Sequence, residues 1–131
     1  MAKVRGRRAS PLAAILWADA ALELVGAAAL LLWRDELRAW LGLGAATLPL
    51  AALFVVGAPA VALLIVTGSR RELVRALALG NLGAGLAGWA FFLVTWSSLE
   101  AEGRWIGPAA SDTFLVLGVL ELLALRRAPA A

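Results

Sequence analysis

The sequence contains no cysteine, no histidine and no tyrosine among its 131 residues. Without cysteine there is no disulfide framework and no thiolate chemistry. Without histidine the chain lacks the usual protein ligand of haem, zinc and copper. The common nucleophile–base pairs are excluded for the same reasons. We therefore expect no enzymatic activity, no bound metal and no cofactor.

Positive charge is present but is not gathered into a patch. The sequence pI is about 11.0, yet the net charge is only +3, and the Lys and Arg residues flank apolar runs. A nucleic-acid-binding domain needs its basic residues clustered on one face, so we expect no nucleic-acid partner. Because tyrosine is absent, the six Trp residues have to supply any aromatic belt at a membrane interface.

Apolar residues make up 63% of the chain, against about 45–50% in an ordinary soluble domain. They form four runs close to the roughly 20 residues that cross a bilayer as a helix. The runs are residues 12–33, 48–67, 73–96 and 108–125. The sequence thus predicts an all-α membrane protein, in which residues 1–131 form a single transmembrane domain with a four-helix bundle in the lipid bilayer.

Local signals predict where these helices begin and bend. Ser10 is a suitable N-cap for the first span, and Pro11 takes the tolerated first position. Ser111 or Asp112 is expected to cap the fourth span. Pro59, near the middle of the second span, should kink it. Both a gating hinge and a merely tolerated proline fit this position.

The residue pattern of the first link, residues 34–43, predicts a short amphipathic helix in the headgroup layer. Four apolar residues fall on one helical face while charged residues cover the rest; they are Trp33, Leu37, Trp40 and Leu41. The alternative is that this segment extends the first span.

The distribution of Lys and Arg predicts the topology. The N-terminus, the second link together with Arg75, and the C-terminus carry four, three and two of these residues, against two and one on the first and third links. By the positive-inside rule both termini are cytoplasmic, in a multi-pass protein of the cell (cytoplasmic) membrane.

A cleavable secretory signal is the alternative at the N-terminus, since a basic start is followed by Ala18-Asp19-Ala20. Only seven apolar residues, from Leu12 to Ala18, precede Asp19, and the apolar run resumes after Glu23. This pattern favours an uncleaved first span.

Four polar residues inside the spans are the candidate site. They are Asp19, Glu23, Asn81 and Glu121. An ionised acid at mid-bilayer costs about 2.5–3.5 kcal/mol on insertion scales, so these side chains should face other helices. All lie in the cytoplasmic half of the predicted spans, and we predict that they form one polar cluster. Arg75, at the foot of the third span, is a possible counter-charge.

Two roles remain open for this cluster. Asp19 and Glu23 are four residues apart and share a helical face, so at least one should be protonated near neutral pH. The acids could act as polar glue between helices. Alternatively, a carboxyl group that exchanges protons inside a membrane could couple protons to transport.

The third span carries small residues at four-residue spacing, which predicts close helix packing. They are Gly80, Ala84, Gly85 and Gly88. Packing inside the bundle and assembly into a homodimer or larger membrane complex are both compatible with this row.

The segments ADAALELVG, WLGL, RALALGN and LGVLELLALRR together resemble uncharacterised small four-span integral membrane proteins of high-GC bacteria. This resemblance implies a four-helix bundle without an assigned activity. A looser similarity is to small multidrug resistance transporters, whose first span carries a membrane-embedded Glu that Glu23 would match. The two expectations for function are an accessory, structural or assembly subunit, and a small proton-coupled transporter of a cationic or apolar solute that uses Glu23 and Asp19.

Overall fold

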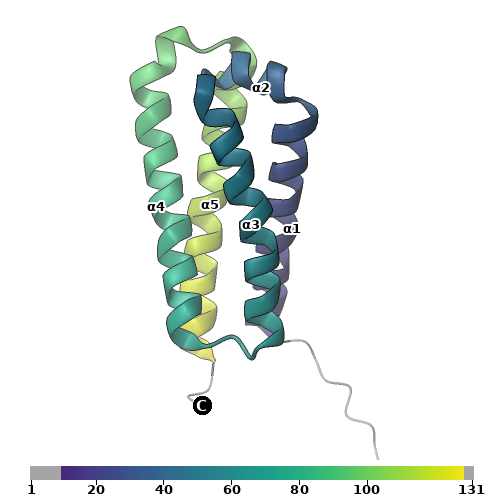
Figure 1. Cartoon of the computed structure of the whole chain (residues 1–131). Helices are drawn as coiled ribbons and strands as arrows, with labels where there is room; N and C mark the ends of the chain where they lie inside the picture. Colours follow the sequence, from purple (N-terminus) through teal and green to yellow (C-terminus); the bar gives the residue numbers. More distant parts are fainter. Residues whose placement is uncertain (1–9, 129–131) are drawn as a thin grey trace, which may run out of the picture.

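In the computed structural model, residues 10–128 are described, and over this range the chain is almost entirely helical. Four long helices run side by side and one short helix lies at one end (Figure 1). The long helices are α1 (Pro11–Leu32), α3 (Thr47–Val66), α4 (Arg71–Thr95) and α5 (Ala101–Arg127). Each belongs to a segment long and apolar enough to cross a membrane, which confirms the predicted class. The basic N-terminal segment and the last three residues lie outside the described range.

The first three spans begin and end within two residues of the predicted segments. Ser10 caps α1 as expected, because its Oγ accepts a hydrogen bond from the amide of Ala13 at 3.1 Å, and Pro11 follows at the first position. α3 continues through Pro59 as one helix. α1 also runs without interruption through Ala18-Asp19-Ala20.

The long helices associate as two pairs. α1 packs against α3 and α4 packs against α5, while a smaller set of contacts joins α1 to α5. The start of α1, the α3–α4 turn and the end of α5 lie at the same end of the bundle (Figure 1). The spans are therefore antiparallel neighbours, as short connections require.

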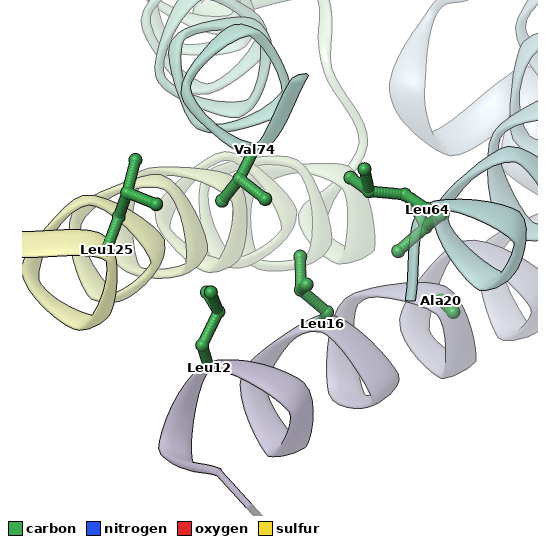
Figure 2. Packing of buried hydrophobic residues seen from close by; sticks show 7 residues of the cluster. Leu12, Leu16, Ala20, Leu64, Val74 and Leu125 are labelled. Atoms are coloured by element: carbon green, nitrogen blue, oxygen red, sulfur yellow. The ribbon is translucent and has the colours of Figure 1, made fainter. Parts of the chain in front are cut away.

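Buried apolar side chains join the two pairs at this end. Leu12 and Leu16 of α1 approach Val74 of α4 and Leu125 of α5, and Leu64 of α3 completes the group (Figure 2). Burial of one such side chain contributes about 1.5–3 kcal/mol in water, but inside a bilayer the gain comes mainly from close packing. The candidate polar residues occur further along the same helix faces.

The first link forms the expected short helix, α2 (Arg34–Leu41). Trp33 separates α1 from α2, and Gly42 follows the last residue of α2 with φ +63°. Leu37 and Leu41 are buried in a second apolar cluster with residues of α1, α3, α4 and the α4–α5 link. These two leucines therefore pack on the end of the bundle, whereas Trp33 stays exposed.

The start of the fourth span was predicted wrongly. α5 begins at Ala101, and Pro108 lies inside it, so neither Ser111 nor Asp112 is a cap. Pro108 removes one backbone hydrogen bond, which costs about 3 kcal/mol in an isolated helix. The turns before it are nevertheless held by tertiary packing. A Cβ on Gly103 would overlap the backbone of Trp40 in α2, and one on Gly107 would meet the ring of Phe92 in α4.

Candidate functional site: a buried carboxyl–amide cluster

The centre of the candidate site is the side-chain amide of Asn81 on α4. Its Nδ2 donates to Asp19 Oδ2 on α1 and to Glu121 Oε2 on α5, both at 3.1 Å. Asp19 and Glu121 are fully buried, and Asn81 is 5% exposed. One amide group thus joins three helices and links the α1–α3 pair to the α4–α5 pair. We call Asp19, Asn81 and Glu121 the polar triad.

Helical periodicity places each member of the triad on a buried face. On α1, Asp19 lies one turn beyond Leu16, and on α5 Glu121 lies one turn before Leu125; both leucines are buried. The close approach of α4 and α5 depends on Gly118, because a Cβ there would come within 2.7 Å of the Ala78 carbonyl oxygen. This approach lets the short Asn81 side chain reach Glu121.

Glu23, the fourth predicted member, is also buried, at 9% exposed, but within residues 10–128 no hydrogen bond joins its carboxyl group to the polar triad. It points at α3, where a Cβ on Gly57 would overlap its carboxyl oxygens. Glu23 Oε2 has no hydrogen-bond partner among the described residues. Gly57 was not predicted as part of the site. The available signal was a glycine in one apolar span at about the same depth as an acid on another span.

Three carboxyl oxygens lie buried without a hydrogen-bond partner within residues 10–128: Asp19 Oδ1, Glu23 Oε2 and Glu121 Oε1. Because both accept a hydrogen bond from the same Asn81 nitrogen, the Asp19 and Glu121 carboxyl groups lie close together. Two ionised carboxylates so close in a dry interior would repel, whereas a proton on either one removes the repulsion. We therefore expect the triad to hold at least one proton.

The predicted counter-charge is not part of the site. Arg75 is exposed, and over the described range the one ion pair is Arg34–Asp35, at 3.4 Å on the surface near the other end of the bundle. The long Arg75 side chain gains more by hydration at the helix end than by entering an apolar interior. Among the described residues, no three acids are arranged to hold a metal ion.

The predicted packing residues of α4 divide into two faces. A Cβ on Gly85 or on Gly88 would collide with Ser111 of α5, so these two glycines mediate the α4–α5 contact. Gly80 and Ala84 are exposed and lie outside this contact. The four-residue spacing is shared by both faces, and only the position of α5 distinguishes them.

Sequence reasoning missed a second polar contact between α4 and α5. Trp89 Nε1 donates to Asp112 Oδ1 at 2.8 Å. Asp112 was assigned to a helix cap because the start of α5 was placed too late. The spacing of Gly103, Gly107 and Ser111, each four residues apart, could have indicated a helix that begins earlier. Ser111 instead donates to the Gly107 carbonyl at 3.1 Å.

The protein was compared with known proteins at three levels. No protein-family model, no curated protein and no solved structure matches the chain.

Proposed function

We propose that this small multi-pass membrane protein is an accessory or structural subunit that packs in the membrane with other chains, and that its intramembrane acids hold its own helices together. The observation that carries the proposal is the bridge from Asn81 to two fully buried acids on different helices. A group so enclosed has no solute to contact, and such interhelical hydrogen bonds stabilise membrane bundles by about 0.6–2 kcal/mol each.

The outer surface supports association with another chain. Gly80 and Ala84 leave the backbone of α4 accessible, and such small residues let a second helix approach closely. A second copy of this chain or another membrane protein would fit this face. We place the protein in the cytoplasmic membrane of a bacterium, with both termini in the cytoplasm.

Cross-linking in native membranes, followed by purification of the full chain in mild detergent, tests the accessory role. We expect other chains to co-purify in fixed stoichiometry, and the pair Gly80→Leu and Ala84→Leu to abolish their recovery. The matched control is Leu79→Phe with Leu86→Phe, two exposed positions on another side of α4. A monomer recovered alone under all conditions, or equal loss in the control, would contradict the proposal.

A small proton-coupled transporter is the second candidate, with Glu23 and Asp19 as the proton-carrying groups. It is favoured by the three buried carboxyl oxygens without partners, which leave positions for protons to occupy. The test uses sealed vesicles with a pH-sensitive dye inside and candidate cationic solutes outside. Uptake that acidifies or alkalises the lumen, is lost in Glu23→Gln and persists in Asp112→Asn would support transport and displace the accessory role.

A further inference from the structure

A pocket of about 630 Å³ opens at the end of the bundle where α1 begins and α5 ends. Its walls come from α1, the end of α3, the α3–α4 turn, the first residue of α4 and the last turns of α5. None of the four polar candidates lines it, so an inference drawn from the pocket does not depend on the proposed function. The volume lies within the range of small-molecule sites.

The lining is polar at one end and apolar at the other. Its polar side chains all sit at the helix ends; they are Ser10, Ser69, Arg71 and Arg127. Ile15, Leu120 and Leu123 form the apolar part of the lining, and both leucines are exposed on the outer surface of α5. Leu120 precedes Arg127 by seven residues, which is about 10 Å along a helix. The pocket thus runs from the charged end of the bundle along the surface of the apolar span.

The two arginines give the pocket a positive entrance. Arg71 Nη1 donates to the Ala128 carbonyl at 3.1 Å, which holds the guanidinium at the rim and leaves other N–H groups free to bind a ligand. Arg127 supplies a second guanidinium, and no acid belongs to the lining formed by residues 10–128. A planar guanidinium matches the oxygens of a phosphate group.

We propose that this pocket binds an anionic phospholipid. The phosphodiester lies between Arg71 and Arg127, and one acyl chain follows Ile15, Leu120 and Leu123. Basic pockets between membrane helices bind lipid headgroups in this manner. The chain's own N-terminal segment is a poorer occupant, because Lys3, Arg5, Arg7 and Arg8 precede Ser10 and carry the same charge as the two arginines.

The experiment measures binding of dioleoyl phosphatidylglycerol to the full chain in a zwitterionic detergent, with bound lipid counted by native mass spectrometry. Arg71→Gln with Arg127→Gln should weaken binding about tenfold or more, since charge-assisted hydrogen bonds to the phosphate are lost. The control pair is Arg75→Gln with Arg126→Gln. These arginines are exposed, lie on the same two helices at the same end and do not line the pocket; we expect less than a twofold change.

Two comparisons identify the ligand. Dioleoyl phosphatidylcholine, which has the same chains and no net charge, should bind at least about tenfold more weakly, and inorganic phosphate at equal concentration should not displace the phosphatidylglycerol. Displacement by phosphate would mean a free-anion site and overturn the lipid proposal.

Arg127→Gln alone leaves the Arg71–Ala128 hydrogen bond in place, so it separates ligand binding from local folding. We expect it to weaken phosphatidylglycerol binding severalfold, while circular dichroism shows unchanged helix content. Unchanged binding in this variant, or equal weakening in the control pair, would show that general positive charge attracts the lipid and would refute the assigned site.

Discussion

At the scale of single residues, the main feature is a set of acids buried without a cation. Asp19, Glu121 and Glu23 are enclosed by helices, and Asn81 is the only side-chain amide in the sequence. An unpaired ionised group would be costly in this interior. The shared amide of Asn81 offsets part of that cost for Asp19 and Glu121, and we expect bound protons to offset the rest without an arginine.

Removal of the shared amide should destabilise the bundle. Asn81→Leu leaves both Asp19 and Glu121 without their donor, and we expect a loss of about 1–3 kcal/mol in the free energy of unfolding. Adding Asp19→Leu and Glu121→Leu replaces all three partners with apolar groups and should recover most of this loss. Reversible unfolding in mixed micelles measures both; failure of the triple variant to recover would argue against the shared-amide account.

Glu23→Gln tests whether Glu23 is neutral in the folded protein. The substitution keeps the shape of the side chain and removes its capacity for charge. We expect the free energy of unfolding to stay within about 1 kcal/mol of the parent, a typical size for one exchanged polar contact. A much larger loss in the same unfolding assay would indicate an ionised Glu23 held by a cation.

At the scale of helices, glycines decide which elements approach closely. Gly57 admits the Glu23 carboxyl group to the surface of α3, and Gly85 and Gly118 bring α4 and α5 together. Gly103 has the same role between α5 and α2. These contacts hold α5 helical on both sides of Pro108, although the proline breaks its hydrogen-bond ladder.

Gly57→Ala should therefore destabilise the α1–α3 pair. The added methyl group overlaps the Glu23 carboxyl group, and overpacking of this kind costs about 1–3 kcal/mol. Gly83→Ala is the matched control, because a Cβ at Gly83 meets nothing within 4 Å; its stability should hold or rise. In Gly57→Ala with Glu23→Ala the overlap disappears and the loss should shrink. Thermal unfolding in detergent gives all three values, and equal stability of the two single variants would disprove the close contact.

At the scale of the whole molecule, the two ends of the bundle differ in chemistry. The end with the α1 start and the α5 end carries a basic pocket, whereas α2 and its buried leucines close the opposite end. Because the number of long antiparallel helices is even, the start of α1 and the end of α5 lie at the same end of the bundle (Figure 1). Basic residues near that end favour its retention in the cytoplasm.

Reporter fusions test this orientation. A reporter that is active only in the cytoplasm should give signal when fused at either terminus and none when inserted near Glu36 or Glu102. A reporter active only outside the cytoplasm should give the reverse pattern. Cytoplasmic signal from the Glu36 or Glu102 position would overturn the predicted topology.

The number of helices able to span a membrane, and most of their ends, could be predicted from the sequence alone. The hydropathy of each segment is enough for these predictions, because the tendency of a segment to leave water for the bilayer depends on its own residues. The N-cap at Ser10 is equally local. Depth counted from the span ends, with the cost of exposing an acid to lipid, also predicted that Asp19, Asn81 and Glu121 would converge together with Glu23.

Only the tertiary structure decided which side of each helix meets a neighbour. The rotation of α4 buries Gly85 and exposes Ala84, and the position of α3 places Gly57 against the Glu23 carboxyl group. The extension of α5 through Pro108 likewise depends on α2 and α4. Rotation and extension of this kind are set by packing between segments distant in sequence, and a span's own hydropathy is nearly the same for every such arrangement.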